Sequence, residues 1–99
     1  MNPEIDEGPI LKIERTAIKP HETAGELTVR LAEIGAALIL KVLDDLESNC
    51  CTPIPQDSKQ ATRAPRLKKT DGYIDWTRSA EQVSNQIRAM QPWPKAVTD

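Results

Sequence analysis

The sequence predicts an incomplete α/β fold, in which a strand and a long helix are followed by an extended linker and a short helix. Three observations support this prediction. Apolar and charged residues alternate within residues 9–18, and apolar residues then recur at every third or fourth position as far as residue 48. The periodicity is lost from residue 49 to residue 72, where prolines and polar residues dominate.

The first element is a strand over residues 9–18, PILKIERTAI, preceded by a loop that is rich in acids, Gly and Pro. Leu11 and Ile13 alternate with Lys12 and Glu14, which predicts a half-buried face. The proline at the first position of the strand is tolerated there, because that residue does not have to donate to a ladder.

A long helix is predicted from Thr23 to about Ser48. Thr23 and Glu26 have the spacing of a capping box, in which each side chain accepts from a backbone N–H of the other. Gly35 lowers the helix propensity by roughly 1 kcal/mol, and close approach of a neighbouring element is the expected reason. We also expect the middle of this helix to be covered on most sides. Its apolar stripe consists of Leu27, Leu31, Ile34, Leu38, Val42 and Leu46, widened by Ile39, Leu40 and Leu43.

The second half of the chain contains one short helix. Ser79 and Gln82 form a second capping box, and the prolines at 92 and 94 end the helix. Short strand-like pieces are expected at residues 73–76 and 96–98. Trp76 and Trp93 flank the helix, where core positions are favoured over stacking on nucleic-acid bases.

These elements do not make a complete core. One strand cannot satisfy its hydrogen-bonding ladder, and the long helix needs more apolar cover than the rest of the chain offers. We therefore expect the chain to be part of a larger fold, or to complete its core with a partner. A sharp, cooperative melt of a strictly monomeric chain would contradict this expectation.

The charge is distributed unevenly along the 99 residues. The formal charge is −2, but residues 1–49 sum to −5 and residues 50–99 sum to +3. A net-acidic chain is not a general nucleic-acid coat. The longest apolar stretch, residues 34–40, is too short to span a bilayer, and no secretory signal is expected at the N-terminus.

The two cysteines, Cys50 and Cys51, are adjacent, so a disulfide between them would be strained. Two free thiols in a reducing compartment are expected, which indicates a cytoplasmic location. A metal site is not expected, because the single histidine, His21, lies far from the cysteines.

Two features offer chemistry. Asp6 lies in a loop before the strand, and Gly8 gives that loop backbone freedom; a carboxylate there can orient a histidine or move a proton, although an ordinary acidic turn fits the spacing better. A basic run also interrupts the linker, and it fits phosphate binding and a solvated linker equally well. This run consists of Lys59, Arg63, Arg66, Lys68 and Lys69.

Two stretches together resemble methionyl-tRNA formyltransferases. Residues 1–11, MNPEIDEGPIL, are similar to the active-site loop of that family, and residues 67–98 are similar to the start of its C-terminal domain. The second stretch contains Ile-Asp-Trp, Asn-Gln-Ile-Arg-Ala and Pro-Trp-Pro and is the more specific of the two. Shorter similarities lie between them, at residues 22–27, 31–33 and 55–57.

The resemblance implies a fold, a reaction and a site. Residues 1–48 would end a Rossmann-like catalytic domain, residues 49–66 would be a linker, and residues 67–99 would begin an OB-like C-terminal domain. The implied reaction transfers a formyl group from 10-formyltetrahydrofolate to the amino group of initiator methionyl-tRNA. The resemblance implies no metal. Asp6 would be the catalytic aspartate, which sets the ionisation and orientation of a histidine, and with Gly8 it would contact the cofactor. The tRNA would be bound by Arg63, Arg66, Lys68 and Lys69.

The family's catalytic Asn and His have no counterpart within this sequence, so the chain is expected to be inactive alone and to need the missing N-terminal part of the enzyme as a partner. Two alternatives stay open. One is a non-catalytic module that binds tRNA or protein, and the other is a fragment of a sugar-nucleotide formyltransferase.

Overall fold

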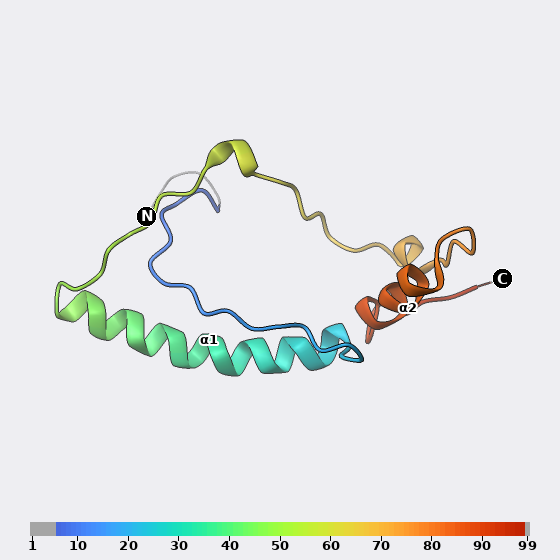
Figure 1. Cartoon of the computed structure of the whole chain (residues 1–99), viewed down its shortest axis with the longest axis horizontal. Coiled ribbons are helices and arrows are strands. Elements are labelled where there is room, and N and C mark those ends of the chain that lie inside the picture. The colour runs from blue at the N-terminus through green and yellow to red at the C-terminus, as the bar shows by residue number, and fades with distance from the viewer. Residues whose placement is uncertain (1–5, 99) are drawn as a thin grey trace. The chain divides into compact units, whose positions relative to one another are not determined.

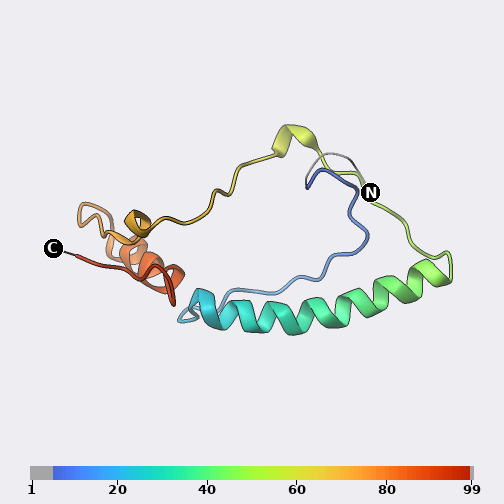
Figure 2. The same cartoon turned by 180° about the vertical axis from the view of Figure 1, so that it is seen from behind.

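The computed structural model describes residues 6–98 of the chain (Figure 1). It contains two α-helices, α1 (Ala24–Glu47) and α2 (Ala80–Ala89), and two short 3-10 helices, η1 (Ser58–Gln60) and η2 (Lys69–Gly72). Coil without regular secondary structure connects these helices, and it can also be followed in the view from behind (Figure 2). The chain divides into two compact units, residues 1–16 with 32–64 and residues 17–31 with 65–99.

The long helix predicted from the apolar stripe is confirmed as α1, which is 24 residues long. One half of the predicted capping box is present, since the Thr23 hydroxyl accepts from the Glu26 N–H at 3.2 Å. Leu27, Ile34 and Leu38 are half-buried. No residue of α1 is fully buried. The periodic sequence therefore forms a helix although few side chains pack against it.

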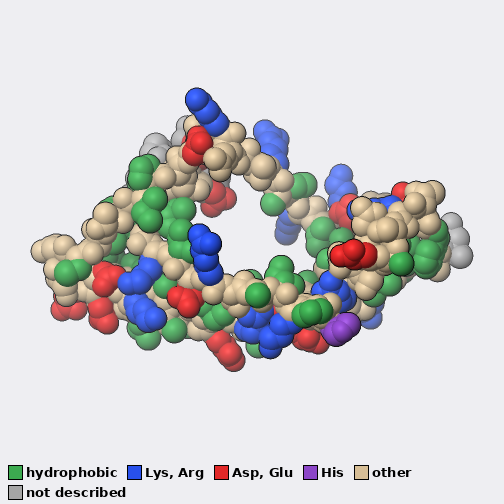
Figure 3. All heavy atoms as spheres, in the orientation of Figure 1, with side chains coloured by type: hydrophobic (Ala, Val, Ile, Leu, Met, Phe, Trp, Pro, Cys, Tyr) green, Lys and Arg blue, Asp and Glu red, His purple; other side chains and the backbone are tan. Residues whose placement is uncertain are grey.

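The predicted cover over the middle of α1 is not provided by the part of the chain that the structure describes. Ile39, Leu40 and Leu43 are each more than half exposed, at 58%, 63% and 55%. On the face seen in Figure 3, hydrophobic side chains lie at the surface among charged ones. The close approach expected at Gly35 was also wrong, because no neighbour among residues 6–98 lies within 4 Å of where a Cβ would be, apart from the local backbone of the helix.

The strand predicted over residues 9–18 was wrong, and residues 6–98 contain no strand at all. Ile10 forms an isolated antiparallel bridge to Ile54 with two hydrogen bonds of 2.7 Å. The physical reason is that a ladder needs a neighbouring strand, and none lies beside the rest of this stretch. Beyond the bridge, Lys12 contacts Asp45 of α1.

The second unit is organised around α2. The predicted capping box is present, because Ser79 and Gln82 each accept from the backbone N–H of the other at 3.1 Å. Val83, at 8% exposure, is the one buried large apolar side chain among the described residues. Trp76 and Trp93 were expected in the core but are 64% and 56% exposed, since the described chain offers too little apolar surface to cover them.

The C-terminal segment returns to η2 within this unit. Val97 forms a parallel bridge with Tyr73, and its N–H donates to the Gly72 carbonyl oxygen at 2.8 Å. Gly72 is buried, and a Cβ there would collide with the carbonyl oxygen of Lys95. The glycine is therefore required by close backbone approach. The strand-like pieces expected at residues 73–76 and 96–98 are reduced to this single bridge.

Candidate functional site

The loop that carries Asp6 has an unusual backbone conformation. Asp6 has a φ of 60°, in the left-handed region that few residues other than glycine adopt, and its side chain is exposed. Aspartate tolerates this region better than most residues, because its short polar side chain can make local hydrogen bonds. Residues 1–5 of the motif used for the sequence resemblance lie outside the described residues. A non-glycine residue held in this region is often found at functional sites.

Gln56 holds this loop from the segment predicted to be a linker. Its side-chain Nε2 donates to the carbonyl oxygens of both Asp6 and Gly8, at 3.0 and 2.6 Å. Both predicted site residues are thus contacted by a third residue to which the sequence analysis assigned no role. The similarity at residues 55–57 was the available signal, but the sequence pattern attached no role to it.

A charged pair lies in the same unit. The Lys12 ammonium contacts the Asp45 carboxylate at 2.7 Å, and this hydrogen bond raises the pKa of Lys12. The pair joins the coil after the Asp6 loop to the end of α1. Cys50 and Cys51 are free thiols, as predicted. Residues 6–98 hold no group of three potential metal-ligating side chains.

The predicted tRNA-binding residues are all exposed. Arg63 belongs to the first unit, whereas Arg66, Lys68 and Lys69 follow in the second, leading into η2. The backbone N–H of Lys68 donates to the Asp71 carboxylate at 2.6 Å, which fixes the chain where these three basic residues meet η2. Their exposure leaves three cations available within four residues of sequence.

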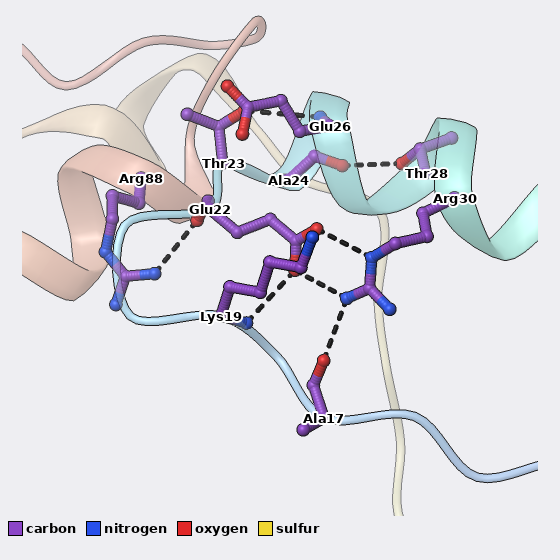
Figure 4. Close-up of polar contacts among 9 residues, drawn as sticks. All are labelled: Ala17, Lys19, Glu22, Thr23, Ala24, Glu26, Thr28, Arg30 and Arg88. Carbon is purple, nitrogen blue, oxygen red and sulfur yellow. Dashed lines mark hydrogen bonds and ion pairs between the residues drawn. The ribbon is translucent and has the colours of Figure 1, made fainter.

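A buried polar cluster just before α1 was not predicted from the sequence (Figure 4). Glu22 is 7% exposed, and Arg30 donates to its carboxylate through Nε at 2.9 Å and through Nη2 at 2.7 Å. The Lys19 N–H also donates to it, at 3.2 Å. The hydrogen bonds from Arg30, followed by that from Lys19, outweigh burial and lower the pKa of Glu22 to about 2.

The same cluster ties α2 to the segment before α1. The Arg88 guanidinium donates to the backbone carbonyl oxygen of Glu22 at 2.9 Å, and the Gly25 N–H donates to the Gln91 carbonyl oxygen at 3.0 Å. These contacts join residues 66 positions apart within one compact unit. Every polar group of Glu22 described here serves this packing, so the cluster has a structural role.

A groove of about 470 Å³ runs along one side of α2. Trp76 and Ile87 are among its apolar lining residues, and Arg78 also lines it. The Trp76 indole N–H is already used, since it donates to the Thr98 hydroxyl at 2.8 Å. The described residues thus include the exposed Asp6 carboxylate in a constrained loop, an exposed basic segment and an apolar groove.

A family model and a solved structure show which class of protein the chain is similar to. Residues 66–99 match the family described as "Formyl transferase, C-terminal domain". The structure is similar over 99% of the chain to 42% of a 4-N formyltransferase from Francisella tularensis, with a TM-score of 0.79 and 24% sequence identity. The chain thus has a formyltransferase-like fold, and residues 66–99 are similar to the C-terminal domain of formyl transferases.

The curated relatives are more specific, and they confirm the resemblance found in the sequence. The chain is 48% identical over 94 residues to the methionyl-tRNA formyltransferase of Solibacter usitatus, covering 95% of the chain and 30% of the relative. It is 42% identical over 98 residues to that of Heliobacterium modesticaldum, covering 99% of the chain and 31% of the relative. The chain therefore spans about a third of the length of the relatives it matches.

No helix in the described part of the chain combines the length and apolar character needed to cross a membrane.

Proposed function

We propose that this chain supplies part of the active site and part of the tRNA-binding surface of a methionyl-tRNA formyltransferase. The observation that carries the proposal is the 48% identity to such an enzyme over 95% of the chain. The Asp6 loop supports it, because a constrained, exposed carboxylate is suited to catalysis.

In the proposed reaction, the free amino group of methionyl-tRNA attacks the formyl carbon of 10-formyltetrahydrofolate. A new C–N bond forms and a tetrahedral oxyanion develops. The amine then loses a proton to a base, and the bond to the folate N10 breaks as N10 takes up a proton. The products are formylmethionyl-tRNA and tetrahydrofolate. General-base catalysis and oxyanion stabilisation are the two needs of this mechanism.

Asp6 fits the role of orienting an imidazole base contributed by the missing N-terminal part of the enzyme. A carboxylate that accepts from one imidazole nitrogen sets the tautomer and leaves the other nitrogen basic. Gly8 lies in the same loop and lets the folate approach the backbone closely. The 99 residues hold only Asp6 of this proposed catalytic set, so we expect no turnover from the chain alone.

The domain arrangement is part of the proposal. Residues 1–48 end a Rossmann-like catalytic domain, residues 49–66 link it to the next, and residues 67–99 begin an OB-like domain in the cytoplasmic enzyme. The family match over residues 66–99 supports the last boundary. The exposed apolar side chains of α1 support a larger fold around the helix.

A chimera tests the proposal. The chain replaces the matching segment of the Solibacter usitatus enzyme, and formylation of methionyl-tRNA is measured. We expect an active chimera, a loss of kcat of about 100-fold or more in its Asp6→Asn variant, and normal activity in Asp44→Asn, an exposed carboxylate on α1. An inactive chimera or a fully active Asp6→Asn variant would overturn the proposal. Formylation by the purified 99-residue chain would overturn its expected inactivity.

The exposed basic residues between Arg63 and Lys69 favour one second candidate, a module that binds tRNA without catalysis. This function predicts that the isolated chain binds tRNA and that Asp6→Asn leaves every property unchanged. The kinetics of the Asp6→Asn chimera therefore separate the two functions.

A further inference from the structure

The side chain of Gln56 bridges two peptide groups of the Asp6 loop. A carboxamide NH₂ carries two hydrogens, and here the nitrogen donates to the carbonyl oxygen of Asp6 at 3.0 Å and to that of Gly8 at 2.6 Å. These contacts connect residues 50 and 48 positions apart in the sequence. One side chain therefore holds the Asp6–Glu7 and the Gly8–Pro9 peptide groups.

The backbone on either side of Gln56 holds it in place. Two residues earlier, Ile54 pairs with Ile10 through two hydrogen bonds of 2.7 Å. One residue later, Asp57 caps η1 by accepting from the Lys59 N–H at 3.0 Å. Gln56 thus lies between a bridge and a helix cap, so the position of its amide is defined by more than its own contacts.

The contacts at these two carbonyl oxygens restrict the backbone that carries the Asp6 carboxylate. Fixing the peptide group that follows Asp6 fixes its ψ, and its φ of 60° is a conformation that needs support from the surroundings. We propose that Gln56 is a positioning residue for formyl transfer, which holds the Asp6 loop in its productive geometry through these two backbone contacts. This inference rests on the proposed function, and it places part of the active site in the segment predicted to be a linker.

The test uses the active chimera and two variants of Gln56. Gln56→Met keeps the length of the side chain and removes both hydrogen bonds. Gln56→Glu also removes both hydrogen bonds, and it places a carboxylate against two carbonyl oxygens, which adds electrostatic repulsion. The matched control is Gln60→Glu, because Gln60 is exposed in η1 and contributes its backbone N–H to the hydrogen bond with Asp57.

We expect kcat to fall about tenfold in Gln56→Met and further in Gln56→Glu, because a small displacement of a catalytic group is costly. The KM for methionyl-tRNA and the melting temperature should stay near those of the parent chimera, and Gln60→Glu should match the parent in every respect. This separation of kcat from KM and from stability is what a positioning role predicts.

Three results would overturn the inference. Unchanged kcat in both Gln56 variants, while Asp6→Asn is inactive, would reject Gln56 and leave the proposed function intact. A fall in melting temperature that accounts for the lost activity would reduce Gln56 to a structural residue. Full activity of Asp6→Asn would remove the proposed function itself, and the inference with it.

Discussion

Arg30 holds the Glu22 carboxylate with two hydrogen bonds, from Nε at 2.9 Å and from Nη2 at 2.7 Å, and both residues belong to the second compact unit. Arg30 also donates to the carbonyl oxygen of Ala17 at 2.8 Å. The pair therefore connects the first turns of α1 to the coil that precedes it (Figure 4). The geometry is that of a planar guanidinium meeting a carboxylate along two parallel bonds.

The lowered pKa of Glu22 predicts acid sensitivity. Its pKa falls from 4.5 to about 2 on folding, so above pH 4.5 the carboxylate is ionised in both states and its contribution to stability is complete. Between these two values the unfolded chain takes up the proton first, and the contribution is lost as the pH falls. We expect the melting temperature of the chimera to drop over this range.

The comparison variants are Glu22→Gln, which removes the titrating group, and Glu33→Gln, an exposed residue of α1. The Glu22→Gln variant should be less stable at neutral pH. Below pH 4.5, its unfolding should take up about one proton fewer than unfolding of the parent. Glu33→Gln should follow the parent. Identical pH profiles for all three proteins would contradict the assigned contacts.

Two glycines are predicted to respond to substitution in opposite directions. Gly72→Ala should lower the free energy of unfolding by about 2–3 kcal/mol, because the new Cβ collides with the Lys95 carbonyl oxygen. Gly35→Ala should raise it by roughly 0.5–1 kcal/mol, because α1 has open space there and alanine favours the helix. Denaturant unfolding of the chimera that carries each substitution measures both changes in the free energy of unfolding. A destabilised Gly35→Ala would mean that another segment of the larger protein packs on that side of α1.

The capping box of α2 can be measured directly. Ser79→Ala removes the acceptor of the Gln82 N–H and should cost about 1 kcal/mol. Ser84→Ala is the matched control, since it makes the same chemical change at an exposed position inside α2. Equal stability of the two variants would show that the cap contributes nothing.

The basic segment is predicted to bind tRNA in a salt-dependent manner. Replacing Arg66, Lys68 and Lys69 by alanine should weaken binding and reduce the slope of log K against log salt by about 2–3, since each lost phosphate contact removes nearly one released counterion. Lys41→Ala, on the exposed surface of α1, should leave both unchanged. Filter binding at several salt concentrations gives the slopes. Unchanged binding by the triple variant would reject this segment as a tRNA contact.

Local signals in the sequence predicted the helices well. The stripe from Leu27 to Leu46 and the Ser79 capping box depend on neighbours three or four positions away, and both helices lie where these signals place them. The strand over residues 9–18 failed, because alternation describes one side of a sheet and says nothing about whether a partner strand is present. The expected burial of Trp76 failed for the same reason, since cover comes from elsewhere in the chain.

The site was predictable in part. Asp6 and Gly8 were identified by resemblance to a loop, and the structure finds them in one constrained turn. The contact with Gln56 was out of reach, because nothing in the sequence pattern relates residues 50 positions apart. The Glu22–Arg30 pair was missed because its spacing of eight residues spans a coil and two helical turns, outside the i,i+4 rule.

The bridge between Ile10 and Ile54 limits how the length of the segment from Ile54 to Gln56 can vary among related sequences. Adding one residue between Ile54 and Gln56 would turn the amide to the opposite side of the extended backbone and away from the loop. The same insertion at residues 61–64, beyond η1, meets no such restriction among the contacts described. Natural insertions and deletions should therefore accumulate after Gln60 and avoid the few residues before it.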